Sequence, residues 1–304
     1  MFKENQLTLG LFFPIESYKE SIPEMDLEEQ MKRAKLTEEA GFASLFVRDV
    51  PLHDLEFGDT GQIYDPWVFL GYLAAHTEKI ALGTGSIVTP LRHPLHIAKS
   101  AASVDRISGN RLVLGIATGD RPIEFTAFSV EREKRSQLFQ ESLHVMRSVW
   151  KDEFPEIQST NINLIEADLL PKPELNDIPV LITGSASQTP DWIAKHGDGW
   201  FFYQRNVDLQ ALRIKEWRSF TSVFKPFAQS LSLDLSDDPN EDPTFMQLGF
   251  RSGRNYLISY LDELKEIGVN HVAFNFKAAA RPVDEMIQEL GEGVVPRFPA
   301  LSTD

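Results

Sequence analysis

Short apolar runs alternate with longer stretches of helical periodicity along the chain. The runs that we expect to be strands are, in order, 7–13, 44–47, 80–83, 112–117, 179–183, 199–203, 227–235 and 272–276. Most of them are apolar without interruption, which is typical of strands buried on both faces of a parallel sheet. In the clearest example, 112–117, Gly115 lies inside the run and Gly119 just beyond it. Ligands bind at the carboxyl ends of such strands, so these glycines mark a candidate site, although a tight turn explains them equally well.

Apolar residues that recur at every third or fourth position predict a helix after each strand. The expected helices begin at or include, in order, Leu27, Asp65, Pro94, Phe139, Thr189, Val207, Leu257 and Val283. Asp26 is a candidate N-cap of the first helix, and Pro94 begins the third, where the missing N–H of proline is harmless. The chain therefore holds eight strand–helix units.

The helix that begins near Asp65 carries apolar residues on every face, from Trp67 to Ala74. A helix of this kind must be covered on two sides. A second subunit would supply the outer cover, so we predict a homo-oligomer, and specifically a homodimer. The alternative is that loops of the same chain cover the helix.

Eight strand–helix units in about 300 residues predict an α/β fold, a (β/α)8 or TIM barrel, as a single domain over residues 1–304. A doubly wound nucleotide-binding sheet would need its glycine fingerprint directly after the first strand, where Gly10 stands alone. The pattern breaks down at 151–176 into Asn, Thr, Pro and short apolar pieces. We interpret this segment as an insertion, with a hairpin as one possible form.

Composition narrows the class of protein. The chain is 42% hydrophobic and 11% aromatic, enough to bury a full core, and its formal net charge of -15 argues against a nucleic-acid partner. It contains no cysteine, so disulfides, thiolate metal sites and a catalytic thiol are excluded. No apolar signal region or membrane-length apolar run is present, and we therefore expect a cytoplasmic, soluble protein without a membrane partner.

If the barrel is correct, the residues that follow each strand meet at one face. Strand by strand, the candidates are Asp49 and His53; Thr84, Gly85 and Ser86; Ala117, Thr118, Gly119 and Arg121; Gly184, Ser185, Ala186, Ser187 and Gln188; and Tyr203 and Arg205. This set is rich in glycine and hydroxyl groups but poor in paired acids and bases. It favours the binding of a large phosphorylated cofactor over hydrolysis by side chains.

The loop 184–189 is the best phosphate candidate. Small residues let the backbone approach an anion, hydroxyl groups can donate to it, and the next helix presents free N–H groups. The alternative is an ordinary N-cap, since Ser and Thr are common before helices. No lysine follows these glycines in the pattern of a P-loop.

These residues also carry a resemblance. Several segments resemble the bacterial luciferase-like monooxygenase superfamily. They are Gly83-Thr84-Gly85-Ser86, His196-Gly197-Asp198-Gly199-Trp200, 38–42, 87–94, 105–119 and 184–186, together with Glu124, Phe125 and Phe128. The resemblance covers most of residues 7–205, in order and at the spacing of that family. It identifies the superfamily and leaves the substrate open.

The resemblance implies a TIM barrel that binds FMN, or in some branches the deazaflavin F420, at its carboxyl face. It implies a non-proline cis peptide at Gly85-Ser86 that supports the isoalloxazine ring. Ala117, Thr118 and Gly119 would lie beside the flavin. The phosphate would be held by the loop after the fifth strand, at Gly184, Ser185, Ser187 and Gln188.

The chain departs from the light-emitting members at three places. Where those have a cysteine, an arginine and a histidine, it has Ala117, Thr118 and Asp49, so we expect no light emission from an aldehyde. Arg121 or Arg205 would have to supply positive charge for the phosphate, although either could equally be a surface salt-bridge residue. Asp49 and His53 are the candidate acid–base residues, and Asp49 could equally cap a turn.

We therefore expect an FMN-dependent oxidoreductase, specifically a two-component monooxygenase acting with O2 on a small organic molecule. No NAD(P)H fingerprint is present, so a separate flavin reductase is the expected partner. An F420-dependent dehydrogenase or reductase shares nearly all of these residues, and a flavin-binding protein without turnover is the third possibility. A metal-dependent hydrolase ranks last, because the strand ends offer too few ligands and no metal site is expected.

Overall fold

The computed structural model describes residues 1–15, 25–54, 56, 64–159 and 162–301. Its centre is a closed ring of eight parallel strands. In order around the ring they are β1 (Thr8–Phe13), β2 (Ser44–Val47), β3 (Ala81–Thr84), β5 (Leu112–Ala117), β8 (Val180–Thr183), β9 (Gly199–Phe202), β10 (Phe227–Leu235) and β13 (His271–Asn275). Because β13 pairs with both β10 and β1, the sheet closes, and the predicted (β/α)8 barrel is confirmed.

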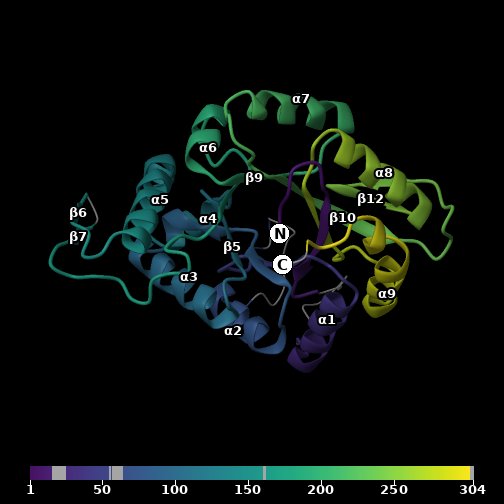
Figure 1. Cartoon of the computed structure of the whole chain (residues 1–304), viewed down its shortest axis with the longest axis horizontal. Coiled ribbons are helices and arrows are strands. Elements are labelled where there is room, and N and C mark those ends of the chain that lie inside the picture. Colours follow the sequence, from purple (N-terminus) through teal and green to yellow (C-terminus); the bar gives the residue numbers. More distant parts are fainter. Residues whose placement is uncertain (16–24, 55, 57–63, 160–161, 302–304) are drawn as a thin grey trace.

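Helices surround the strands (Figure 1). They are α1 (Leu27–Glu39), α2 (Pro66–His76), α3 (Pro94–Ser108), α5 (Arg135–Lys151), α6 (Pro190–His196), α7 (Val207–Arg218), α8 (Arg254–Glu266) and α9 (Val283–Gly293). Asp26 caps α1 as predicted, since its carboxylate accepts hydrogen bonds from the backbone N–H groups of Glu28 and Glu29. Asp65 caps α2 in the same way.

Several short elements modify the connections. Beyond β3 come β4 (Ile87–Val88) and the 3-10 turn η1 (Thr89–Leu91), and α4 (Pro122–Ala127) and η2 (Arg132–Lys134) precede α5. A hairpin of β11 (Thr244–Met246) and β12 (Gly249–Ser252) extends the far end of β10, and η3 (Val295–Arg297) follows α9. The insertion at 151–176 contains a hairpin of β6 (Ile157–Gln158) and β7 (Asn163–Leu164), which lies outside the ring of helices beside α5 (Figure 1).

The interior of the barrel is a packed core and not a channel. Side chains from six different strands fill it, namely Phe46, Val113, Leu181, Phe201, Ala228 and Ala273, and Met1, Phe2 and Phe12 pack against them. The buried His271 ring bonds to the hydroxyl groups of Thr8 (2.8 Å) and Ser44 (2.9 Å). Burial lowers the pKa of His271 to about 3, so the ring is neutral. Chemistry with a ligand must therefore take place at the mouth of the barrel.

Helix α2 is covered on one side only. Phe69, Leu70 and Leu73 are buried against the barrel, whereas Val68 is 72% exposed and Tyr72 is 39% exposed. The described parts of the chain therefore leave Val68 and Tyr72 exposed on this helix, and the predicted homodimer stays a prediction. None of the helices in the described ranges has the length and apolar character needed to cross a bilayer.

Candidate functional site

The peptide bond between Gly85 and Ser86, at the end of β3, is cis, as the sequence resemblance implies. This segment lies directly on aromatic rings that belong to the barrel core. A Cβ atom at Gly85 would come within 2.7 Å of the Phe12 ring and 3.3 Å of the Phe201 ring, so the position requires glycine. The Ser86 hydroxyl forms a hydrogen bond with the hydroxyl of Thr183 at the end of β8. The Gly85-Ser86 segment thus forms a flat backbone platform on an aromatic base.

Thr84 lies behind this platform. Its side chain is fully buried, its hydroxyl donates to the Gly115 carbonyl oxygen (2.7 Å), and it accepts from the Gly115 N–H (2.9 Å). Both hydrogen bonds join β3 to β5 at the point where the two strands diverge. Thr84 therefore positions the platform, and its hydroxyl is already used within the sheet.

The end of β5 forms the next part of the mouth. Ala117 and Gly119 are partly exposed, while Thr118 is buried. Gly119 has a φ angle of +80°, and a Cβ atom there would lie 2.7 Å from a methyl group of Val88. The backbone can turn sharply here only because residue 119 is glycine.

The loop after β8 has an unusual backbone. Gly184, Ala186 and Ser187 have φ angles of +60°, +46° and +53°, which is the left-handed region. Successive changes of backbone hand of this kind make concave surfaces that accept anions. The Ser185 and Ser187 side chains are exposed, whereas Ala186 is buried. The loop therefore presents backbone and hydroxyl groups outward, as the phosphate interpretation requires.

Two neighbours hold this loop in place. The Gln188 amide nitrogen donates to the Ser136 hydroxyl (2.8 Å), and the Gln140 amide nitrogen donates to the Gln188 amide oxygen (2.7 Å). The Tyr203 ring lies 3.3 Å from where a Cβ atom on Gly184 would be. The Thr189 side chain makes no capping hydrogen bond to the backbone of α6. Its hydroxyl instead bonds to the Asp191 carboxylate and lowers the pKa of that group.

The two arginines considered for the phosphate lie in different surroundings. Arg121 is 5% exposed and lies close enough to Glu124 to affect its ionisation. Arg205 is exposed, and its guanidinium lies 5.0 Å from the centre of the Phe202 ring. Contact of either with a phosphate stays a prediction.

Glu124 is an ionisable residue of the site that the sequence did not predict to have a functional role. Its side chain is 2% exposed, and one carboxylate oxygen has no hydrogen-bond partner. Burial raises its pKa to about 7, the Arg121 charge opposes this, and Asp49, Asp120 and Asp54 add to it. Only its position directly before the apolar Phe125, which is buried, could have signalled burial.

Asp49 is held by Arg92. The Arg92 guanidinium donates to both Asp49 carboxylate oxygens (3.0 and 2.8 Å), and the Val88 N–H donates to one of them (3.1 Å). This bidentate pair ties the segment after β2 to β4 and favours a positioning role for Asp49. His53 is exposed, on a loop whose residues 55 and 57–63 lie outside the described part of the chain. Acid–base roles for Asp49 and His53 stay predictions.

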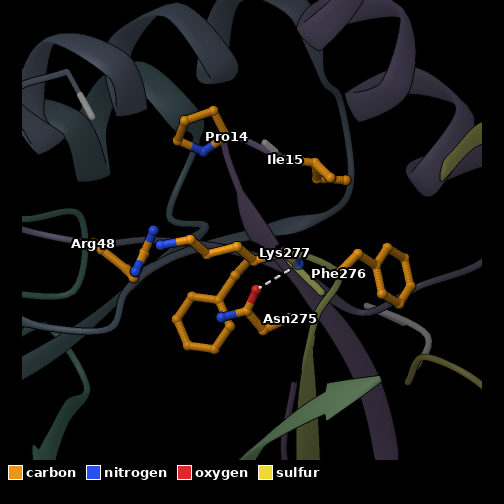
Figure 2. Close-up of a pocket in the computed structure, with 7 residues that line it drawn as sticks. Pro14, Ile15, Arg48, Asn275, Phe276 and Lys277 are labelled. Atoms are coloured by element: carbon orange, nitrogen blue, oxygen red, sulfur yellow. Dashed lines mark hydrogen bonds between the residues drawn. The ribbon is translucent and has the colours of Figure 1, made fainter. Parts of the chain in front are cut away.

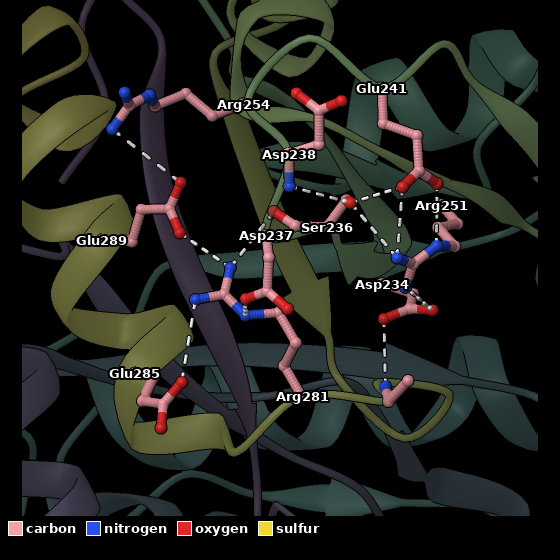
Figure 3. Close-up of polar contacts among 11 residues, drawn as sticks. Asp234, Ser236, Asp237, Asp238, Glu241, Arg251, Arg254, Arg281, Glu285 and Glu289 are labelled. Atoms are coloured by element: carbon pink, nitrogen blue, oxygen red, sulfur yellow. Dashed lines mark hydrogen bonds and ion pairs between the residues drawn. The ribbon is translucent and has the colours of Figure 1, made fainter.

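The ends of β10 and β12 are occupied by a network of arginines and carboxylates (Figure 3). Arg251 pairs with Asp234 (2.9 Å) and Glu241 (2.8 Å), and Arg281 pairs with Asp237 (2.6 Å) and Glu289 (2.7 Å). Many barrels bind phosphate after strands seven and eight, but here carboxylates surround the arginines. This arrangement favours the β8 loop as the place for an anion.

The mouth thus combines a glycine platform, an aromatic base and an anion-accepting loop. Within the described ranges, no group of three or more His, Asp or Glu side chains is placed to hold a metal ion. The parts fit a planar, phosphorylated cofactor, because glycine admits a flat ring and the β8 loop admits its phosphate.

Comparison with known proteins defines the class. Residues 7–230 match the sequence model of the luciferase-like monooxygenases, and the chain belongs to this family. An uncharacterised Mycobacterium tuberculosis protein is 33% identical over 190 residues, 61% of this chain and 66% of its own length. The alkanal monooxygenase alpha chain of Photorhabdus luminescens is 26% identical over 55% of this chain and 45% of its own length.

One further relative is named for its cofactor, the deazaflavin F420. The F420-dependent hydroxymycolic acid dehydrogenase of Mycobacterium tuberculosis is 28% identical over 58% of this chain and 49% of its own length. The chain thus spans about half to two thirds of these relatives. Among solved structures, monooxygenase RslO1 from Streptomyces bottropensis has a TM-score of 0.80 at 19% identity, covering 96% of this chain and 99% of that one. A riboflavin lyase solved with modified FMN has a TM-score of 0.77 at 14% identity, with 98% and 93% covered. These two likenesses show the fold alone.

Proposed function

We propose that the protein is an FMN-dependent monooxygenase that uses reduced flavin and O2 to oxygenate a small organic molecule. The observation that carries this proposal is the close packing of Gly85 on the Phe12 and Phe201 rings, with Ser86 hydrogen-bonded to Thr183 at the start of the β8 loop. Membership of the luciferase-like monooxygenase family supports the oxidoreductase class. The riboflavin lyase, which shares the fold, was solved with a modified FMN, and FMN is the cofactor that we propose here.

In this proposal Gly85 and Ser86 would support the isoalloxazine ring, with Ala117, Thr118 and Gly119 beside it. The backbone of the β8 loop and the hydroxyl groups of Ser185 and Ser187 would hold the phosphate. Tyr203 closes that side. When bound in its reduced form, the flavin supplies the electrons that activate O2.

The chain's own residues bind, orient and exclude water. Phe12, Phe46 and Phe201 lie within 6.1 Å of one another, centre to centre, and keep water away from beneath the platform. Thr84 and the Asp49–Arg92 pair fix the positions of β3 and β4 under the ring. We propose further that a separate reductase supplies the reduced flavin.

A second candidate is hydride transfer with F420, because one of the relatives is named as an F420-dependent dehydrogenase. The same platform and loop would accept the deazaflavin. The two functions differ in the cofactor that binds and in whether O2 is consumed.

The test is an anaerobic titration of the purified protein with FMN, reduced FMN and F420, followed by absorbance and fluorescence. We expect FMN to bind and Gly85→Val to weaken it strongly, because the added side chain meets Phe12. Ser185→Ala removes one hydrogen bond to a charged group, and we expect about a tenfold loss of affinity. Ser259→Ala, on the outer helix α8, is the matched control and should leave binding unchanged.

The outcomes separate the candidates. FMN binding followed by incorporation of an oxygen atom from 18O2 into a substrate, absent when only the flavin reductase and FMN are present, supports the monooxygenase. A preference for F420 selects hydride transfer, and FMN binding without O2 consumption for any substrate offered selects a flavin-binding protein without turnover. If neither cofactor binds, the proposed function is wrong.

A further inference from the structure

Two hydroxyl groups, those of Ser86 and Thr183, form a hydrogen-bonded pair at the mouth of the barrel, and we call them the hydroxyl pair. Ser86 follows β3, and Thr183 is the last residue of β8. These two strands are not neighbours in the sheet, because β5 lies between them. The hydroxyl pair therefore spans the carboxyl end of β5, in the part of the mouth where the flavin is proposed to bind.

The Thr183 side chain points toward the axis of the barrel. Successive side chains of a strand point to opposite faces of the sheet, and Leu181, two residues earlier in β8, belongs to the apolar cluster inside the barrel. Leu181 is fully buried, whereas Thr183 is partly exposed. Thr183 is thus the polar residue at which β8 leaves the apolar interior and reaches the mouth.

A missing side chain on β5 makes room for the hydroxyl pair. A Cβ atom on Gly115 would lie 1.9 Å from the Thr84 carbonyl oxygen and 3.3 Å from the Ser86 hydroxyl oxygen. The first distance excludes any side chain at this position, and the second shows that the Ser86 hydroxyl lies beside β5. Ser86 and Thr183 are both partly exposed, so glycine at 115 leaves the hydroxyl pair accessible from the mouth.

The opposite side of the mouth offers little room. In the ring of eight strands, β1 lies across from β8. Beside the carboxyl end of β1, between Pro14, Arg48 and Phe276, the described residues leave a space of about 10 Å3, enough for one water molecule (Figure 2). This side does not admit a flavin ring, which favours polar contacts with the ring on the side of the hydroxyl pair.

The hydroxyl pair has one donor proton to spare. Two hydroxyl groups hold two protons, and the hydrogen bond between them uses one. Within the ranges that the structure describes, neither hydroxyl makes a further hydrogen bond. The second proton can therefore be donated into the mouth. Hydrogen bonds in a chain polarise one another, so the bond between the two hydroxyl groups strengthens the outer one as a donor.

We propose that Thr183 is a further flavin-contacting residue and that the hydroxyl pair donates one hydrogen bond to the isoalloxazine ring. This bond is stronger to the reduced ring, because the reduced ring loses a proton near neutral pH and then carries a negative charge. The hydroxyl pair thus gives the protein a preference for reduced over oxidised FMN. The inference rests on the proposed function, because it adds a residue and a selectivity to the same site.

The test compares the dissociation constants of oxidised and reduced FMN, measured at pH 8 by anaerobic absorbance and fluorescence titration of the whole chain. Thr183→Val keeps the shape of the side chain and removes the hydroxyl. We expect the preference for reduced FMN, which is the ratio of the two constants, to fall about tenfold in this variant. The two-electron midpoint potential of bound FMN then falls by about 30 mV, which spectroelectrochemistry measures independently. Ser86→Ala should lower the ratio equally.

Further variants separate a flavin contact from a purely structural role. Thr183→Ser keeps the hydroxyl and should keep the preference for reduced FMN. A double variant, Ser86→Ala with Thr183→Val, should lower the ratio no further than either single change, because the hydroxyl pair acts as one donor. Thr244→Val, at an exposed threonine of β11, is the matched control and should leave both constants unchanged. Far-UV circular dichroism of each variant reports whether it is folded.

The inference is overturned if Thr183→Val and Ser86→Ala keep the wild-type ratio, even where they weaken both forms of FMN alike, as a damaged loop would. It is also overturned if Thr183→Ser lowers the ratio as much as Thr183→Val. Wild-type protein that binds both forms of FMN with equal affinity would contradict the inference and leave the proposed flavin site standing. Wild-type protein that binds neither form would contradict the proposed function and the inference together.

Discussion

At the scale of single residues, Glu124 makes the stability of the protein depend on pH. Its pKa is raised by burial to about 7, whereas an unfolded chain leaves it near 4.5. Between these values the unfolded state loses its proton while the folded state keeps it, so stability falls as pH rises. The slope is at most about 1.4 kcal/mol per pH unit, or about 3 kcal/mol across the window.

We predict that Glu124→Gln removes this dependence. The free energy of unfolding of the variant, relative to wild type, should increase between pH 5 and pH 8 by up to about 3 kcal/mol. Urea unfolding at each pH measures it. Glu131→Gln, at a glutamate that is 67% exposed, is the control and should run parallel to wild type. Parallel curves for Glu124→Gln as well would show that this carboxyl is not perturbed.

The residue scale also shows what a sequence can and cannot reveal. The cis bond at Gly85-Ser86 and the exposed hydroxyl groups of Ser185 and Ser187 follow from local residue types and a family pattern. The ion pair between Asp49 and Arg92 could not be predicted in this way, because the two residues are far apart in the sequence and only the fold brings them together.

At the scale of elements, continuous apolar runs predicted most of the barrel strands, because burial on both faces leaves a clear pattern. Alternating apolar residues predicted the strands at 227–235 and 272–276. Helix α4 (Pro122–Ala127) and the hairpin of β11 and β12 were not predicted. Both are short, and neither presents a full period of buried residues. Their position depends on contacts with the barrel, such as the pairing of β12 with the end of β10.

One arginine holds the connection between α2 and β3. The Arg111 guanidinium donates to carbonyl oxygens of Ala74 (3.1 Å), Thr77 (2.9 Å) and Ile80 (2.9 Å), to the Thr77 hydroxyl (2.9 Å), and to the Ser108 carbonyl oxygen (2.6 Å). It therefore satisfies carbonyl groups at the carboxyl end of α2 that have no partner within the helix.

We predict that Arg111→Met lowers the free energy of unfolding by about 2 to 4 kcal/mol, because several partly buried carbonyl groups lose their donor at once. Urea unfolding at pH 7 measures the change. Arg106→Met is the control. It removes a surface ion pair between Arg106 and Glu174, which are 49% and 51% exposed, and should change the free energy of unfolding by less than about 1 kcal/mol. Equal effects of the two substitutions would contradict this account of Arg111.

At the scale of the whole molecule, the barrel was predictable and its assembly was not tested. Eight repeated units leave few ways to bury their apolar faces, and the closed sheet is the result. The outer side of α2 is different, because the residues that the structure describes leave it exposed. Val68 and Tyr72, one helical turn apart on the outer side, are the residues that a second subunit would bury.

We predict that the protein is a dimer in solution, with a mass twice the 34.4 kDa of one chain, and that α2 lies in the interface. Val68→Asp should raise the dimer dissociation constant by more than about a hundredfold, since a two-fold axis would bury two like carboxylates together. Sedimentation velocity over a range of concentrations measures it. Leu212→Asp, at a leucine that is 64% exposed on α7, is the matched control and should remain dimeric. A monomeric wild type would show that the dimer prediction is wrong, while a dimer that survives Val68→Asp would place the interface on another face and leave the outer stripe of α2 without a partner.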